Sequence, residues 1–174
     1  MNIVLIGYRG TGKSHVGRVL AGRLSFPYIS IDRAIVSRAG MSIPAIVEQY
    51  GWSGFRDRES QEVREISGWD NIIIDCGGGV VERPENIDCL RENGCMIWLK
   101  ATVQTIVRRI EGGANRPALT AGKSFTEEVA EVLERRTPLY RAAAMHEVET
   151  DERDPEDIAA EIISFWQKST RTSL

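Results

Sequence analysis

The octet at residues 7–14, Gly-Tyr-Arg-Gly-Thr-Gly-Lys-Ser, constrains the fold of this chain more than any other stretch. It matches the phosphate-binding pattern G-x-x-x-x-G-K-[ST] at every fixed position. An apolar run at residues 3–6 precedes it and suits a buried parallel strand. Residues 15–24 follow with apolar side chains at helical spacing. A strand, a glycine loop and a helix N-terminus in this order predict a cradle in which backbone N–H groups and the helix dipole bind an anion.

The side chains of the octet indicate how a nucleotide is held. Lys13 offers a mobile cation for the outer phosphates, and the hydroxyl of Ser14 can ligate Mg²⁺. The alternative, a chance match in a glycine-rich turn, is disfavoured by the strand and the helix that flank the loop. The residues expected to contact the nucleotide here are Gly10, Thr11, Gly12, Lys13, Ser14 and His15.

The rest of the chain alternates short apolar runs with helical patterns. This alternation predicts an α/β fold of three layers, in which helices cover both faces of a parallel sheet. A length of 174 residues suits a single domain over residues 1–174. The expected strands lie at 3–6, 28–31, 72–76, 95–99 and 146–149, and the helical patterns cover 15–24, 43–50, 56–66, 102–110, 124–138 and 154–167.

Two stretches fit this alternation poorly. Residues 32–64, approximately, form a long helical excursion between the second and third strands. Residues 111–123 place glycines around Asn115-Arg116-Pro117, and a loop of this length is often a lid over a functional site. Arg116 is then a candidate to be delivered to a phosphate, although a plain mobile surface loop is the alternative.

Carboxylates follow the second and third strands, where ligands bind in open α/β sheets. Asp32 is placed either to orient an acceptor hydroxyl and accept its proton or to cap the next helix. Asp75 stands near the end of the third strand, where an ionised carboxylate either supports hydrated Mg²⁺ or caps a turn. Ser14 and Asp75 are therefore the expected metal-binding residues.

Glycines and arginines complete the candidate site. The glycine run at 77–79 follows the third strand, and a close backbone approach to a ligand and a sharp turn explain it equally well. Arg56, Arg116 and Arg141 recur at positions expected to face ligands, and arginine forms bidentate pairs with carboxylate and phosphate. Together they predict an anionic acceptor beside an anionic donor.

Composition limits the partners. A net charge of −3 provides no overall basic field for nucleic acid or membrane, and no apolar stretch approaches a membrane span. The three cysteines show no metal-ligand spacing, and their odd number argues against a disulfide framework, which indicates a reducing cytoplasm. The expected partners are small molecules, and the chain is large enough to act as a monomer.

Four motifs, taken in order, resemble the shikimate kinase family over nearly the whole chain. They are Gly51-x-x-x-Phe55-Arg56-x-x-Glu59, Gly77-Gly78-Gly79, Arg116-Pro117 and Pro138-Leu139-Tyr140-Arg141. The resemblance implies a P-loop fold like that of nucleoside monophosphate kinases, with strand order 2-3-1-4-5, a lid and a helical acceptor-binding region. It also implies Mg²⁺-dependent transfer of the γ-phosphate of ATP to the 3-hydroxyl of shikimate.

The same resemblance implies roles for individual residues. Asp32 binds acceptor hydroxyls and serves as base, while Lys13 and Arg116 stabilise charge on the transferred phosphoryl group. Glu59 braces Arg56. The implied substrate-binding residues are Asp32, Arg56, Gly77, Gly78, Gly79 and Arg141, and the implied nucleotide contacts beyond the loop are Arg109, Arg116, Arg153 and Pro155.

The chain departs from the family pattern at the metal site. Ser30 stands where the family usually carries the first aspartate of an Asp-x-Asp pair, and Asp75 stands where a small polar residue is common. We therefore hypothesise that Asp75 assumes the metal-supporting role that Ser30 lacks. Near the acceptor, Trp52 replaces a usual acidic residue and Val47 a common aromatic one. Phosphorylation of another polyol acid, such as gluconate, and a non-catalytic nucleotide-binding module stay open as alternatives.

Overall fold

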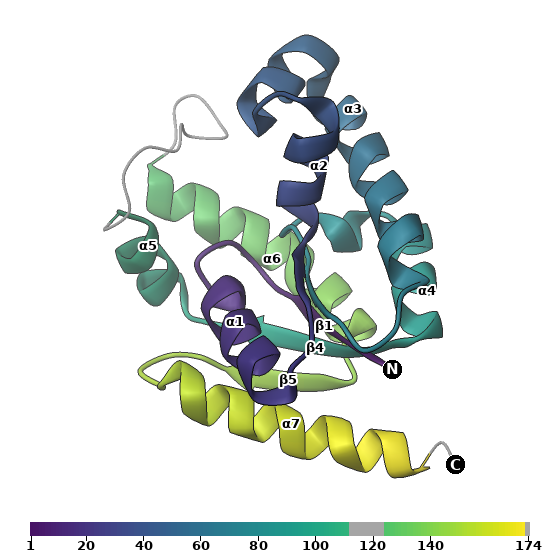
Figure 1. The fold of residues 1–174 in the computed structure, drawn as a ribbon. Coiled ribbons are helices and arrows are strands. Elements are labelled where there is room, and N and C mark those ends of the chain that lie inside the picture. The colour runs from purple at the N-terminus through teal and green to yellow at the C-terminus, as the bar shows by residue number, and fades with distance from the viewer. Residues whose placement is uncertain (112–123, 173–174) are drawn as a thin grey trace.

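Five parallel strands form one sheet in the order β2-β3-β1-β4-β5 (Figure 1). The computed structural model describes residues 1–111 and 124–172. The strands are β1 (Asn2–Ile6), β2 (Tyr28–Ser30), β3 (Ile73–Asp75), β4 (Gly94–Lys100) and β5 (His146–Glu149). The helices are α1 (Lys13–Leu24), α2 (Ile31–Ala39), α3 (Ile43–Ser67), α4 (Pro84–Glu92), α5 (Val103–Glu111), α6 (Phe125–Ala143) and α7 (Pro155–Thr172), with a 3₁₀ turn η1 (Val80–Glu82). The sheet order and the α/β class confirm the fold expected from the sequence.

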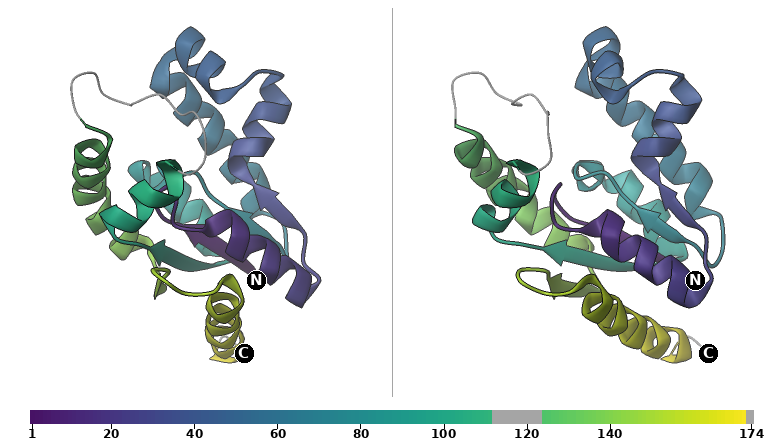
Figure 2. Two further views of the ribbon diagram at one scale, coloured as in Figure 1. Left: turned by 90° about the vertical axis from the view of Figure 1, so that its left-hand side faces the viewer. Right: turned by 60° about the vertical axis from the view of Figure 1, so that its left-hand side comes forward.

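Helices cover both faces of the sheet, because alternate residues of a strand point in opposite directions (Figure 2). Ile3 and Leu5 of β1 belong to a core that includes residues of α1 and α7. Val4 and Ile6 belong to a second core that includes residues of α3, α4 and α6. All four side chains are fully buried, so β1 is the centre of a three-layer structure.

The strand register brings the chemistry-bearing segments to one edge of the sheet. Ser30 at the end of β2 pairs with Asp75 at the end of β3, and Asp75 in turn pairs with Leu5 of β1. The phosphate-binding loop starts at Gly7, directly after β1. Ser30, Asp75 and the loop are therefore neighbours, although they are far apart in the sequence.

Element α3 agrees with the two helical patterns expected between residues 43 and 66, since it consists of two helices that meet at a kink at Gly51 with φ of 69°. Two other elements differ from the sequence expectations. Helix α4 was not expected, because its nine residues carry only a short apolar pattern behind Pro84. Helix α6 continues through Pro138 to Ala143. Proline removes one backbone hydrogen bond, and packing of the helix on the core outweighs this loss.

None of the helices in residues 1–111 and 124–172 combines the length and the apolar character needed to span a bilayer. Apart from Glu111, the predicted lid at 111–123 lies outside the described residues, and so does Arg116.

Candidate active site

The phosphate-binding loop depends on three glycines with positive φ. Gly7, Gly10 and Gly12 have φ values of 139°, 79° and 93°, which other residues rarely adopt. A Cβ atom on Gly7 would also overlap the carbonyl oxygen of Leu99. Gly12 is the N-cap of α1 and makes no side-chain cap, so the first turn of the helix is presented to an anion.

Lys13 and Thr11 hold the loop in shape from inside. The Nζ atom of Lys13 donates to the carbonyl oxygens of Gly7 and Tyr8 at 2.9 and 3.0 Å, with the side chain 8% exposed. The Oγ1 atom of Thr11 also donates to Tyr8, at 2.8 Å. Thr11 therefore supports the loop with its side chain, and its hydroxyl does not face the main cavity.

A cavity of about 850 Å³ lies beside this loop. It is lined from both sides by residues that the sequence singled out, which come from the loop, α2, α3, the glycine run and α5. The predicted residues that line it are Gly10, Gly12, Lys13, Ser14, His15, Asp32, Arg56, Asp75, Gly77, Gly78, Gly79 and Arg109. Its size is ample for a nucleotide or for a small acid, and the two predicted substrate sides share one space.

Ser14 and Asp75 meet at the edge of the sheet. The Oγ atom of Ser14 donates to Oδ2 of Asp75 at 2.7 Å, and the hydroxyl of Tyr28 donates to the same oxygen at 2.5 Å. Burial raises the pKa of Tyr28 to about 12, and the hydrogen bond to Asp75 adds to this shift. Tyr28 is therefore a permanent donor that orients the Asp75 carboxylate.

The oxygen atoms of Ser14 and Asp75 suit a hard cation whose other ligands come from phosphates and water. In residues 1–111 and 124–172 no group of three or more His, Cys, Asp or Glu side chains is arranged to hold a metal ion. Mg²⁺ often uses one or two protein oxygens together with phosphates and water, and Ser14 and Asp75 supply hard oxygen ligands beside the loop.

Ser30 has a structural role at the start of α2. Its side chain accepts a hydrogen bond from the backbone N–H of Arg33 at 3.4 Å and so caps the helix. The alternative that Asp32 caps this helix is therefore wrong, since Asp32 lies in the first turn. Its carboxylate lines the cavity instead, at the N-terminal end of the helix dipole.

Two glycines of the run, Gly77 and Gly79, are explained by close approach of side chains to the backbone. A Cβ atom on Gly77 would lie 2.7 Å from Oε1 of Glu59 and 2.9 Å from Oδ1 of Asp32. A Cβ atom on Gly79 would overlap the guanidinium group of Arg56. Only glycine lets these charged groups pack against the turn, a reason that differs from both ligand approach and a sharp turn, the two expected from the sequence.

Arg56 is held in place by a buried carboxylate. Its Nη1 atom donates to Oε2 of Glu59 at 2.7 Å, and Glu59 is fully buried. Burial raises the pKa of Glu59 to about 7, although the charge of Arg56 and its hydrogen bond oppose the shift. The Oε1 atom of Glu59 is buried and has no hydrogen-bond partner among the residues that the structure describes. The bracing of Arg56 expected from the sequence is therefore confirmed in its geometry.

Arg141, predicted to contact the acceptor, is not brought to the cavity with the other predicted substrate-binding residues. Its guanidinium group contacts Glu147 at 3.4 Å and lies over the ring of Trp98, away from the cavity. Arg136 lines the cavity in its place. Tyr140 is fully buried and donates to the carbonyl oxygen of Gly78, and Arg136 lies one helical turn earlier on the same face. The i, i+4 relation to a buried tyrosine was the signal that could have identified Arg136.

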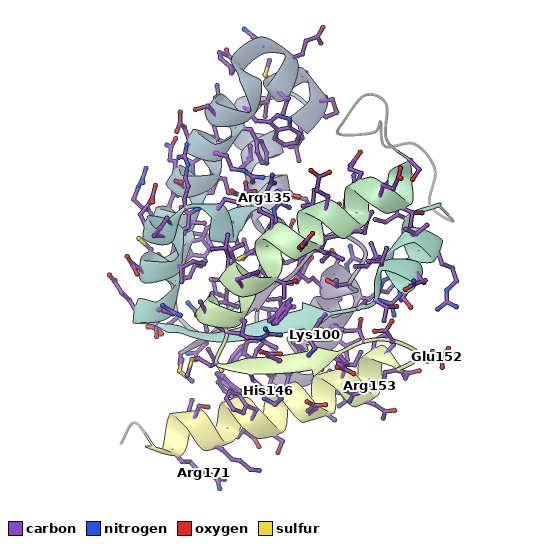
Figure 3. The ribbon with its side chains drawn as sticks, turned by 180° about the vertical axis from the view of Figure 1, so that it is seen from behind. Lys100, Arg135, His146, Glu152, Arg153 and Arg171 are labelled. Carbon is purple, nitrogen blue, oxygen red and sulfur yellow. The ribbon has the colours of Figure 1, made fainter. Side chains whose placement is uncertain are left out.

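Of the nucleotide contacts implied beyond the loop, only some are brought to the cavity. Arg109 donates to the carbonyl oxygen of Gly10 at 3.2 Å and to the carbonyl oxygen of Thr150 at 2.7 Å, so it joins the loop to the segment after β5. Arg153 contacts Glu149 and Glu161 and, like Pro155, lies outside the cavity lining. Figure 3 shows Arg153 beside α7, whereas Arg135 lies on the side of α6 that faces α3.

Five further charged residues line the cavity and were not expected: Arg9, Glu82, Glu128, Glu131 and Arg135. Arg9 of the loop contacts Glu128 of α6 at 3.2 Å. Glu82 of η1 and Arg135 of α6 form an ion pair at 3.2 Å on the acceptor side. No local motif marks them, because each is placed by tertiary contacts between elements distant in sequence.

The sheet order, the glycine loop, Lys13, and a cavity that joins a phosphate cradle to a set of arginines define a P-loop kinase that acts on a small molecule. The family model for shikimate kinase matches residues 9–167. The chain therefore belongs to the shikimate kinase family, and its activity is that of an ATP-dependent phosphotransferase.

Individual relatives agree with this assignment. The shikimate kinase of Symbiobacterium thermophilum is 39% identical over 169 residues, which cover 97% of each chain. That of Dehalococcoides mccartyi is 37% identical and covers 99% of this chain and 97% of its own. The solved structure of the Acinetobacter baumannii enzyme in complex with shikimate has a TM-score of 0.90 at 31% identity, covering 97% of this chain and 93% of its own.

Proposed function

We propose that the cavity binds ATP along the loop at residues 7–15 and binds shikimate between α3, the glycine run and α6. The observation that carries this proposal is the convergence of Arg56 and Arg136 in the same cavity as Lys13 and Asp32. Two guanidinium groups suit a fixed carboxylate, because each presents a planar set of donors. A relative with the same fold was solved in complex with shikimate.

The proposed roles follow from the placement of each group. Asp32 orients the 3-hydroxyl of shikimate toward the γ-phosphate and accepts its proton. Lys13, which now donates to loop carbonyls, exchanges these bonds for phosphate oxygens. Arg116, outside the described residues, is proposed to contact the transferred phosphoryl group from the lid at 111–123.

We also propose that Ser14 and Asp75 hold the Mg²⁺ that accompanies ATP. When bound, the ion neutralises charge on the β- and γ-phosphates. The pairing of β2 with β3 supports this role, because it places Asp75 directly beside Ser30. Ser30 stands where the family usually carries a metal-supporting aspartate. Asp75→Ser should raise the half-saturating Mg²⁺ concentration about tenfold, as expected for one lost charged ligand contact, and should weaken Mn²⁺ binding to the ADP complex. Shikimate KM should change little. An unchanged requirement for the metal would contradict the role of Asp75.

A coupled ADP-release assay with shikimate, quinate and gluconate side by side tests the acceptor. We expect turnover with shikimate to exceed turnover with the other two, and equal rates with gluconate would support the polyol-acid alternative. Arg136→Ala and Arg141→Ala form a matched pair on one helix. The first should raise shikimate KM at least about tenfold through loss of a charged hydrogen bond, and the second should leave it unchanged.

The remaining features of the proposal concern the whole molecule. We propose that residues 1–174 form one domain and act as a monomer on small molecules in the cytoplasm, without nucleic acid or membrane partners. The net charge of −3 supports the absence of a nucleic-acid partner. Light scattering during gel filtration measures the mass directly and would reveal a dimer.

A further inference from the structure

One carboxylate on the acceptor side contacts three arginines from two different helices. The Oε1 atom of Glu82 accepts hydrogen bonds from Nε of Arg136 at 2.9 Å and from Nη2 of Arg135 at 3.2 Å. Its Oε2 atom lies 3.4 Å from Nε of Arg56. Glu82 thereby connects α3 and α6 through the short turn η1 that follows the glycine run.

Glu82 contacts the two arginines proposed to bind the acceptor at equivalent atoms. Glu82 contacts Arg56 and Arg136 at Nε, the end of each guanidinium group nearest the backbone. In the planar guanidinium group Nη2 shares the edge of Nε, whereas Nη1 lies on the opposite edge and points away from Glu82. The Nη1 atom of Arg136 lies 3.6 Å from the position of a Cβ on Gly78, so this end of the group reaches the glycine run.

Burial makes this shared carboxylate important. The side chains of Arg56 and Arg136 are only 14% and 11% exposed. Two cations at such sites repel one another and lose hydration, and a shared carboxylate offsets both effects. Partial burial opposes ionisation of Glu82, yet the charge and hydrogen bond of Arg136, with the charges of Arg56 and Arg135, hold its pKa below the ordinary value.

We propose that Glu82 is a positioning residue for the acceptor, which holds Arg56 and Arg136 at their Nε atoms and so aims their terminal nitrogens at the acceptor carboxylate. This inference rests on the proposed function, because it takes Arg56 and Arg136 as the carboxylate-binding pair. Loss of Glu82 should affect Arg56 and Arg136 unequally. Arg56 keeps its bond to Glu59 when Glu82 is lost, whereas Arg136 loses its contact at Nε.

The test compares the full chain with three variants in steady-state kinetics. Glu82→Gln keeps the shape of the side chain and removes its charge. We expect shikimate KM to rise about tenfold, with kcat and ATP KM within about twofold, as for loss of one charged hydrogen bond at the acceptor. Glu82→Asp keeps the charge on a shorter stem and should restore part of the affinity. Glu134→Gln removes an exposed charge on α6, the helix that carries Arg135 and Arg136, and as the control it should change none of the three constants.

A double-mutant cycle separates positioning from a general loss of stability. If Glu82 acts through Arg136, Glu82→Gln should raise shikimate KM by less than about twofold in the Arg136→Ala background. Fully additive effects, or a parental KM in Glu82→Gln, would overturn the proposal. If Glu82→Gln fails to fold, Glu82→Asp carries the same cycle. An unchanged KM for Arg136→Ala would instead overturn the acceptor assignment, and the role of Glu82 with it.

Discussion

Replacement of Gly79 by alanine is expected to disable the acceptor site while leaving the fold intact. A Cβ atom at this position would lie 2.6 Å from Nη1 of Arg56 and closer still to its Nη2 and Cζ atoms. The backbone at Gly79 has φ of −100° and ψ of 5°, so alanine introduces no backbone strain. The clash involves only the far end of a flexible side chain, which can move away without disturbing the core.

The size of the effect follows from these distances. The nearest atom, Nη2, would lie 1.9 Å from the Cβ, and ordinary van der Waals contact begins at about 3.4 Å, so the rigid guanidinium group must retreat by about 1.5 Å. A retreat directly away from Glu59 stretches the 2.7 Å bond between Nη1 and Oε2 to about 4.2 Å, beyond the limit of hydrogen bonding. Loss of the aligned Arg56 contact to the acceptor carboxylate should cost about 2 kcal/mol, or about thirtyfold in shikimate KM.

Steady-state kinetics and thermal unfolding together decide the outcome. We expect Gly79→Ala to keep ATP KM within about twofold of the parent, since the nucleotide loop is untouched. Arg56→Ala should abolish most of the additional effect of Gly79→Ala in the double variant. Gly94→Ala is the contrasting control, because its Cβ would overlap the backbone oxygen of Leu90, and it should lower the melting temperature instead. A Gly79→Ala enzyme with parental shikimate KM would refute the reasoning.

Three other perturbations test separate parts of the structure. Glu59 holds its proton up to about pH 7 when folded but only to about 4.5 when unfolded, so its contribution to stability falls as pH rises through this window. Glu59→Gln should flatten that fall, by up to about 3 kcal/mol in urea unfolding curves compared at pH 5 and pH 8. Arg109→Ala should raise ATP KM and spare shikimate KM, with the neighbouring exposed Arg108→Ala as control; equal effects on both substrates would contradict its nucleotide-side placement. Tyr28→Phe should lower the free energy of unfolding by about 1 kcal/mol, measured by urea titration, because the hydroxyl that orients Asp75 is lost.

The nucleotide half of the site was predictable from sequence because its determinants are local. The octet at 7–14, the apolar run before it and the helix after it specify a strand, a loop and a helix within one short segment. The strand pattern also predicted the parallel sheet. Asp75 was expected near the metal, and its contact with Ser14 follows from strand register.

The acceptor half was predicted less well, because its residues come from distant elements. Helix α6 shows the reason. A motif placed Arg141 in the site, but a shift of five residues along a helix changes the face that a side chain occupies. The buried Tyr140 fixes the rotation of α6, and that rotation turns Arg136 toward the glycine run and Arg141 toward Glu147.

By itself, the sequence determined that this chain folds as a P-loop kinase and predicted phosphate binding at residues 7–14, since local backbone geometry and periodicity carry that information. Only the tertiary structure decided which arginines line the cavity and that Glu82 joins Arg56 and Arg136. It also decided that Gly77 and Gly79 are glycines because charged side chains pack against them. Contacts between α3, η1 and α6 join residues far apart in the chain, and no local pattern specifies how such elements rotate against one another.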